Sequence, residues 1–96
     1  MREKAIETKL TQAVKRKGGL CPKFVSPGWD GVPDRIVLLP GRRLAFVEVK
    51  APGEHMRPLQ VYRKRQLEAL GFLVYCLDDP AKIDKLLTEI EGGDAR

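Results

Sequence analysis

The chain has 96 residues, 43% of them hydrophobic and 32% charged, so we expect one folded domain, residues 1–96, and not a disordered chain. No apolar run is long enough to cross a bilayer and the N-terminus lacks the apolar stretch of a signal peptide, so we expect no membrane contact and a cytoplasmic location. Lys and Arg number 18 against 13 Asp and Glu, and this charge of +5 favours a nucleic acid as partner, although many small basic proteins bind none.

The first half of the chain is predicted to form one helix followed by three strands. Apolar residues recur at helical spacing over residues 3–17 and two glycines follow, which is typical of a helix and its end. Residues 20–25 are predicted to be a short strand, and residues 26–33 are rich enough in turn formers to be a loop. Residues 34–40 and 43–50 are apolar strands, and the Pro-Gly-Arg sequence at their junction predicts a tight hairpin.

The second half continues with two helices and a strand. After a loop at residues 51–57, a proline opens a helix that should run to residue 70. Residues 72–77 are an apolar strand, and a second proline, at position 80, opens the last helix after an Asp N-cap. Residues 92–96 should be a frayed tail. The expected order is α-β-β-β-α-β-α, so we predict an α/β fold with a mixed central sheet flanked by helices.

Two charged side chains interrupt the apolar pattern near the end of the second hairpin strand. Alternate strand residues share a face, so Glu48 and Lys50 lie on one face, roughly 6 to 7 Å apart along the backbone. If the hairpin folds between positions 41 and 42, Asp34 lies opposite Val49, and a slip of one or two residues still leaves it beside the glutamate. Two carboxylates and one ammonium group are therefore expected to converge at the open end of the hairpin.

These groups suit a divalent metal ion, Mg²⁺ or Mn²⁺. Neighbouring carboxylates repel each other unless a cation lies between them, and both ions prefer oxygen ligands. Asp34 and Glu48 are the predicted ligands, and the backbone carbonyl of Val49 could supply a third oxygen. A bound ion would polarise a phosphodiester, while Lys50 holds the attacking water or stabilises the developing charge. An ordinary salt bridge from Lys50 to either carboxylate is the alternative.

The stretches GVPDRIVLL, LAFVEVKAPG, PLQ and LEALGFLVYCLDD together resemble the virus-type replication-repair nuclease (VRR-NUC) domain of the PD-(D/E)xK nuclease superfamily. The resemblance covers nearly the whole chain and rests on Gly31-x-Pro33-Asp34, Glu48-x-Lys50 and a glutamine that opens the next helix. It implies a restriction-endonuclease-like core and a metal-dependent DNA endonuclease. Small stand-alone members are associated with viruses and with homodimers that cut branched DNA such as four-way (Holliday) junctions. The resemblance therefore also implies a protein of bacteria, or of a phage in its host's cytoplasm.

The two helices that flank the hairpin are expected to supply further site residues. The family has an acidic residue on the first helix, and Glu7 matches it. Glu7 flanks the buried stripe, where it could hold a metal-bound water or a second metal ion, and a solvated Glu7 is the alternative. The family glutamine matches Gln60, which could bond the scissile phosphate or order Lys50 at a helix N-terminus that favours phosphate. Gln66, near the buried side of the same helix, is the competing choice.

A set of basic residues is expected to hold DNA backbone phosphates without reading sequence. The chain has no recognition-helix or zinc-finger motif, which favours structure-selective cleavage. A four-way junction has twofold symmetry, so a homodimer would supply two matched sites. Each basic residue could equally be a solvated surface charge. The set comprises Arg35, Arg42, Arg43, Arg57, Arg63 and Lys64, with Arg65 and the first-helix residues Lys15, Arg16 and Lys17.

Four remaining residues have simpler expected roles. Cys21 and Cys76 lie in predicted strands without a C-x-x-C pair and should be small buried hydrophobes. His55 should be a solvated loop side chain, and Trp29 should pack its loop, with stacking on a base as the alternative. Two other functions stay open, namely a non-catalytic basic module that binds nucleic acid and a nuclease that nicks or cuts linear duplex.

Overall fold

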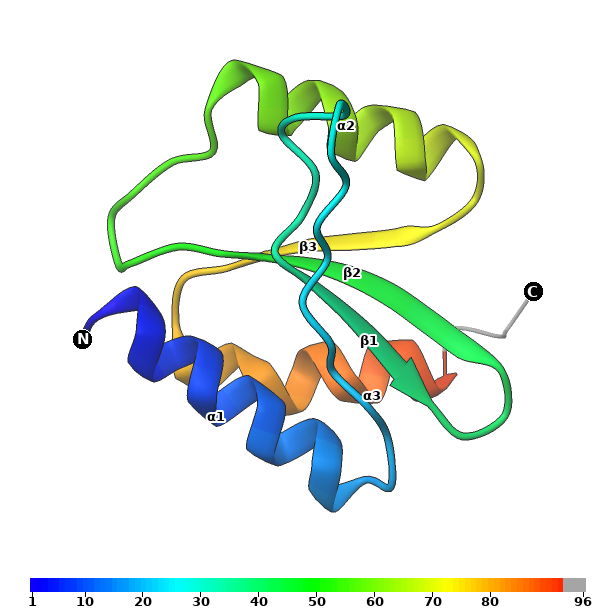
Figure 1. Ribbon diagram of the computed structural model, residues 1–96. Coiled ribbons are helices and arrows are strands. Elements are labelled where there is room, and N and C mark those ends of the chain that lie inside the picture. The colour runs from blue at the N-terminus through cyan, green and yellow to red at the C-terminus, as the bar shows by residue number, and fades with distance from the viewer. Residues whose placement is uncertain (93–96) are drawn as a thin grey trace.

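The computed structural model describes residues 1–92 and contains a three-stranded mixed sheet (Figure 1). Strands β1 (Arg35–Leu39) and β2 (Arg43–Val49) form the antiparallel hairpin, and β3 (Leu73–Leu77) pairs with β2 in parallel. The strand order is β1-β2-β3, so β2 is central and β3 lies at one edge. The predicted hairpin and the predicted mixed sheet are confirmed.

Helices cover both faces of this sheet (Figure 1). Helices α1 (Glu3–Arg16) and α3 (Ile83–Gly92) lie on one face, and α2 (Pro58–Ala69) lies on the other. A short 3-10 helix, η1 (Pro80–Lys82), leads into α3 after Asp79 caps its first turn. The predicted tail lies outside the described residues except for Gly92, which ends α3. Within residues 1–92, none of the helices combines the length and the apolar character that a membrane span requires.

The side chains of β2 alternate between the two faces of the sheet, as the sequence predicts, and enter two separate core clusters. Ala45, Val47 and Val49 are buried in the larger cluster, which includes the apolar stripes of α1 and α3. Phe46 faces the other way, into a smaller cluster beneath α2 with Leu67 of that helix. Since Glu48 follows Phe46 at the same spacing, its carboxylate enters the α2 side of the sheet at the boundary of an apolar cluster.

The hairpin register differs by one residue from the predicted one. Arg35 pairs with Val47 and Leu39 pairs with Arg43, so the hairpin folds about Gly41 and not about the bond that follows it. Gly41 has φ +85° and Arg42 has φ +61°, so two left-handed residues make the turn. The prediction that Asp34 lies opposite Val49 was therefore wrong: the observed register places Asp34 opposite Glu48.

The predicted first strand at residues 20–25 is also wrong, because only two isolated bridges form there. Leu20 bridges to Leu38 and Lys23 bridges to Arg35, both antiparallel. Between them lies Pro22, which accepts a hydrogen bond from the N–H of Ile36 but has no N–H to return. The order of elements is thus α-β-β-α-β-α, with residues 20–24 running along β1 as an interrupted edge segment.

The two cysteines are free thiols in different surroundings. Cys21 is half-buried against the larger core cluster, in partial agreement with the prediction. Cys76 is exposed in β3, so the expectation of a buried hydrophobe was wrong for this residue. The reason is the position of β3 at the sheet edge, which leaves Cys76 with fewer neighbours than a central strand would provide.

Candidate active site

Asp34 lies at the open end of the hairpin, one residue before β1. The register that pairs Arg35 with Val47 would place Pro33 opposite Val49, and proline has no N–H for the ladder. Val49 instead donates its N–H to Asp34 Oδ2 at 2.9 Å. For the same reason β1 offers the Val49 carbonyl no ladder donor at position 33. The carboxylate of Asp34 is therefore fixed against the main chain at Val49, next to Glu48.

The loop before Asp34 packs closely against α2. Gly31 has φ +84°, and a Cβ at this position would lie 2.7 Å from Leu59 Cγ of α2. Arg63 of α2 donates from Nε to the carbonyl of Asp30 at 2.7 Å and lies 5.1 Å above the ring of Trp29. The predicted packing role of Trp29 is confirmed. These contacts explain why the Gly-x-Pro-Asp sequence is required locally, since the backbone must pass close to a helix before the carboxylate is presented.

Glu48 is a buried carboxylate with only one hydrogen-bonded oxygen. Its residue is 2% exposed, and Oε2 accepts a hydrogen bond from Gln60 Nε2 at 2.8 Å and lies 3.5 Å from Lys50 Nζ. Among residues 1–92, Oε1 has no hydrogen-bond partner. Burial, followed by the negative charge of Asp34, raises the pKa of Glu48 to about 7, and the ammonium of Lys50 opposes this rise. Glu48 is therefore poised to lose its proton when a cation approaches.

Gln60 joins Glu48 to the start of α2. Its Nε2 donates to Glu48, while its Oε1 accepts the N–H of Arg57 at 2.8 Å, which satisfies a free donor at the helix N-terminus. Gln66, the competing choice, accepts instead from Arg63 Nη1 at 3.0 Å. The structure thus brings Gln60, and not Gln66, to the carboxylate of Glu48. The contact made is to Glu48, whereas the sequence suggested a contact to phosphate or to Lys50.

On α1, Glu3 is the acidic residue whose charge interacts with Asp34 and Glu48. The predicted residue, Glu7, pairs with Arg35, with 2.7 Å between Oε2 and Nε, and the two side chains are 19% and 17% exposed. Partial desolvation and then the charge of Asp34 raise the pKa of Glu3, and Lys50 lowers it. Glu3 in turn contributes to the raised pKa of Glu48. The sequence reasoning missed Glu3, although its spacing to Ile6 and to Leu10 matches the argument used for Glu7.

Two of the basic residues predicted to contact DNA bond instead to groups within the protein. Arg35 donates to the carbonyl of Cys21 at 2.8 Å, in addition to its ion pair with an α1 carboxylate. Arg63 holds the loop carbonyl of Asp30 and the ring of Trp29. Both guanidinium groups therefore stabilise the frame around Asp34.

The other predicted contacts are distributed over the molecule. Arg42 and Arg43 lie at the hairpin turn, about 17 Å along β2 from the position of the buried glutamate. Lys64 pairs with Glu68 on the surface of α2 at 2.9 Å. Arg57 is exposed at the N-terminus of α2, directly before the helix turn that carries Gln60. Of these residues, Arg57 lies closest in the fold to the carboxylate pair.

The oxygen donors at the end of the hairpin fit a hard divalent cation. Within residues 1–92, no group of three or more His, Cys, Asp or Glu side chains is close enough to hold a metal ion. Mg²⁺, however, commonly binds through one or two carboxylates together with water and substrate phosphate. Asp34 and Glu48 supply two carboxylates, and Glu48 Oε1 is a buried oxygen that needs a partner. The carbonyl of Val49 is a third oxygen at the same place.

Comparison with known proteins identifies the family. No protein-family model matches the chain. A relative named "Putative nuclease p44", from Acyrthosiphon pisum secondary endosymbiont phage 1, is 50% identical over 78 residues, which cover 81% of this chain and 84% of the relative. A solved structure described as a "VRR_NUC domain" superposes with a TM-score of 0.85 at 28% identity, over 90% of this chain and 94% of that one. The chain therefore belongs to the VRR-NUC family of nucleases.

Proposed function

We propose that this nuclease domain is a Mg²⁺- or Mn²⁺-dependent endonuclease that hydrolyses phosphodiester bonds of DNA. The observation that supports this most strongly is the buried carboxylate of Glu48, whose Oε1 has no hydrogen-bond partner among residues 1–92 while Asp34 lies beside it. Two carboxylates held this close cost free energy unless a cation joins them. A divalent ion that prefers oxygen ligands removes that cost.

Each hairpin residue of the site has a proposed role. Asp34, Glu48 and the backbone carbonyl of Val49 would hold the ion, which when bound polarises the scissile phosphate and lowers the pKa of a coordinated water. Lys50, 3.5 Å from Glu48 Oε2, would orient the attacking water or stabilise the charge that develops on the phosphate. Gln60 is proposed as a positioning residue, because its 2.8 Å bond fixes the carboxylate of Glu48.

The acidic role on α1 is proposed for Glu3. Its charge already acts on both predicted metal ligands, so it could order a metal-bound water or contribute to a second ion. Glu7, the residue predicted from the sequence, would take this role only after its ion pair with Arg35 opens. Substituting each glutamate separately by Gln distinguishes them, because only the residue that orders the water should slow cleavage at saturating metal.

The proposed substrate is DNA, with four-way junctions as the leading choice. The charge of +5 supports a polyanionic substrate, and Arg57 is an exposed cation close to the carboxylate pair. A homodimer would match the twofold symmetry of a junction. The phage origin of the similar nuclease supports a phage-encoded protein that acts in the cytoplasm of a host cell.

A cleavage assay tests the activity and ranks the substrates. Labelled linear duplex, flap and four-way junction DNA are incubated with the protein in Mg²⁺, Mn²⁺ or EDTA. The expected result is cleavage that requires the ion and is fastest on the four-way junction. Equal cutting of all substrates would reject junction selectivity and leave a duplex nuclease. Retention of DNA without cleavage in either metal would reject the enzyme in favour of a basic binding module.

Two charge-matched variants test the assignment of Asp34. Asp34→Asn keeps an acceptor for the N–H of Val49 but removes the charge, and we expect cleavage to fall at least about 100-fold. Asp30→Asn removes the same charge from the exposed loop four residues earlier and should cut like the parent. An Asp34→Asn variant as active as the parent would remove Asp34 from the proposed ligand set.

A further inference from the structure

A polar hollow of about 470 Å³, the α1 hollow, opens between α1 and the interrupted edge segment that runs along β1. It adjoins the proposed metal site, because Glu3 lines it and interacts through its charge with Asp34. Arg35, the residue directly after Asp34, lines it as well. The proposed site therefore continues into an open space on the α1 side of the sheet. The charged residues of this lining are Glu3, Lys4, Glu7, Lys23 and Arg35.

The interrupted edge segment brings Lys23 into the α1 hollow. Lys23 forms an antiparallel bridge with Arg35, so the two side chains lie on the same face of the sheet. The next residue, Phe24, points the other way and packs against Phe46 on the α2 side, with 5.5 Å between the ring centroids. The segment that fails to form a strand thus presents a cation opposite α1.

Most polar groups of the α1 hollow are already bonded within the protein. Glu7 is paired with Arg35 at 2.7 Å, and Arg35 also donates to the carbonyl of Cys21 at 2.8 Å. Thr8 and Thr11 donate their hydroxyl hydrogens to main-chain carbonyls of α1, at 3.0 and 2.9 Å. These groups stabilise the walls of the hollow and have little capacity left to bind a ligand.

Two lysines of the α1 hollow differ from these groups. Among residues 1–92, neither the ammonium group of Lys4 nor that of Lys23 has a hydrogen bond or an ion pair. Because Glu7 is neutralised by its ion pair, the two free ammonium groups outnumber the remaining carboxylate, that of Glu3. Ammonium groups that line one hollow repel each other, and an anion between them replaces repulsion with attraction. Lys is a common ligand of phosphate, which it binds as a flexible point charge.

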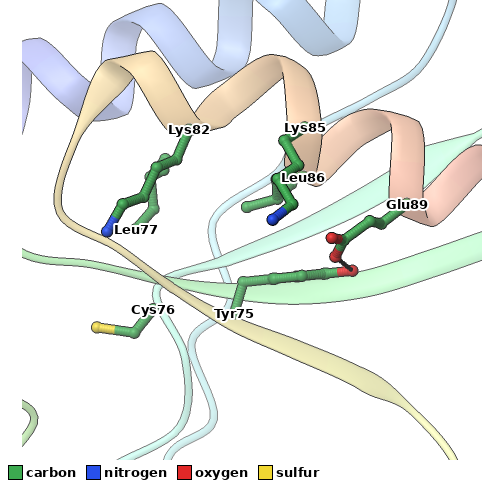
Figure 2. Close-up of a pocket in the computed structure, with 7 residues that line it drawn as sticks. All are labelled: Tyr75, Cys76, Leu77, Lys82, Lys85, Leu86 and Glu89. Carbon is green, nitrogen blue, oxygen red and sulfur yellow. Dashed lines mark hydrogen bonds between the residues drawn. The ribbon is translucent and has the colours of Figure 1, made fainter.

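A second hollow, of about 240 Å³ between β3 and α3, offers fewer free charges (Figure 2). Its Lys82 contacts Asp78 at 3.2 Å, and its Glu89 accepts a hydrogen bond from the Tyr75 hydroxyl at 3.1 Å. In the described part of the chain, Lys85 is the one cation of this lining without a partner. The second hollow adjoins β3, at the sheet edge opposite β1, so Lys85 is a matched control for a lysine of the α1 hollow.

We propose that the α1 hollow binds one backbone phosphate of the DNA strand that is cut, near the scissile phosphate, through Lys4 and Lys23. Helices α1 and α2 lie on opposite faces of the sheet, so this strand would cross the open end of the hairpin (Figure 1). It would pass from Arg57 at the start of α2, over the carboxylates of Asp34 and Glu48, to the α1 hollow. The proposal rests on the function proposed above and adds the path of the substrate across the site.

Neutral variants test the contact through DNA affinity. Lys23→Gln should weaken binding of linear duplex about 10-fold at about 0.1 M salt and reduce the slope of log affinity against log salt by about 1. Lys85→Gln removes the same charge from the second hollow and should match the parent, as should Lys23→Arg, which keeps the charge. Fluorescence anisotropy in Ca²⁺ measures the slopes. A Lys23→Gln variant with the slope of the parent would overturn the proposal.

A lysine footprint locates the DNA on the unaltered protein. Duplex DNA should slow the acetylation of Lys4 and Lys23 by N-hydroxysuccinimide acetate at least about 5-fold, read by mass spectrometry, and leave Lys85 unchanged. Equal acetylation of Lys23 with and without DNA would also overturn the proposal. Cleavage in Mg²⁺ is measured in parallel. Cleavage without protection of Lys23 would reject the α1 hollow alone, whereas protection without metal-dependent cleavage would reject the proposed activity alone.

Discussion

The carboxylate of Glu48 is buried at a free-energy cost, because one of its oxygens has no hydrogen-bond partner among the described residues. It is 2% exposed, its Oε1 has no partner among residues 1–92, and burial and Asp34 raise its pKa to about 7. In the unfolded chain Glu48 has its ordinary pKa of 4.5. Between pH 4.5 and about 7, the folded state therefore binds more protons at this residue than the unfolded state does. Stability from this group is present below pH 4.5 and is lost as the pH rises through about 7.

Replacing Glu48 by Gln should therefore stabilise the metal-free chain at high pH. We expect Glu48→Gln and the parent to have similar free energies of unfolding near pH 4.5, and the variant to be more stable by about 1 to 3 kcal/mol above pH 7. Urea unfolding in EDTA across this range measures the difference. Asp30→Asn in the exposed loop is the control and should leave the pH dependence unchanged. A difference between Glu48→Gln and the parent that does not vary with pH would contradict the burial argument.

Gln60 should affect cleavage through Glu48 and not through DNA binding. Gln60→Ala removes the 2.8 Å bond to Glu48 and the acceptor for Arg57 N–H, so we expect metal affinity and kcat to fall about 10- to 100-fold while KM for DNA changes little. Gln66→Ala, which removes the contact to Arg63, serves as the matched control. A rise in KM with unchanged metal affinity would instead place Gln60 on the phosphate.

At the scale of elements, the loop before Asp34 depends on its close approach to α2. Gly31→Ala meets both a φ of +84° and an overlap with Leu59, whereas Gly28→Ala meets a similar φ of +81° in open space. We expect Gly28→Ala to cost about 1 kcal/mol. Gly31→Ala should cost about 1 to 3 kcal/mol more and slow cleavage about 100-fold, because it displaces Asp34. Thermal unfolding and cleavage rates measure both effects, and equal results for the two variants would remove the packing argument.

The elements that repeat a simple period could be predicted from the sequence. The apolar stripes of the helices and the alternation of β2 place Glu48 on the α2 side without any knowledge of tertiary contacts. The hairpin register could not be obtained to one residue, because it depends on two left-handed turn residues, one of them Arg42. Pro22 likewise interrupts a ladder that apolar composition alone predicted as a strand.

The interaction partners of side chains were harder to predict than the sheet or helix face on which each side chain lies. Glu7 and Glu3 both flank the buried stripe of α1, and the position of Arg35 on β1 decides which carboxylate is paired and which acts on the site. Arg63 was expected to contact DNA, yet the loop carbonyl of Asp30 holds it. Such choices depend on contacts between residues about 30 positions apart, which spacing along one element cannot reveal.

At the scale of the whole molecule, the position of each cation should decide its effect on DNA binding. Arg57→Ala should weaken binding on all sequences and reduce the slope of log affinity against log salt by about 1. Arg42→Ala, at the hairpin turn, removes the same charge about 20 Å along the strand from Glu48. It should leave that slope nearly unchanged. Fluorescence anisotropy in Ca²⁺ at several salt concentrations measures the slopes. Equal slopes for the two variants would place the DNA across the hairpin turn as well.

The fold brings the residues of the proposed active site to one end of the hairpin. Residues from the loop before β1, from β2 and from α2 meet there, because β2 is central and α2 packs over the face that carries Glu48. The central claim is that Asp34, Glu48 and the Val49 carbonyl bind one divalent ion. An anomalous difference map from a crystal soaked in Mn²⁺ tests it most directly. The account predicts one strong peak within about 2.2 Å of an oxygen of each of these three residues. A map with no peak there, or with a peak bound by neither carboxylate, would contradict it.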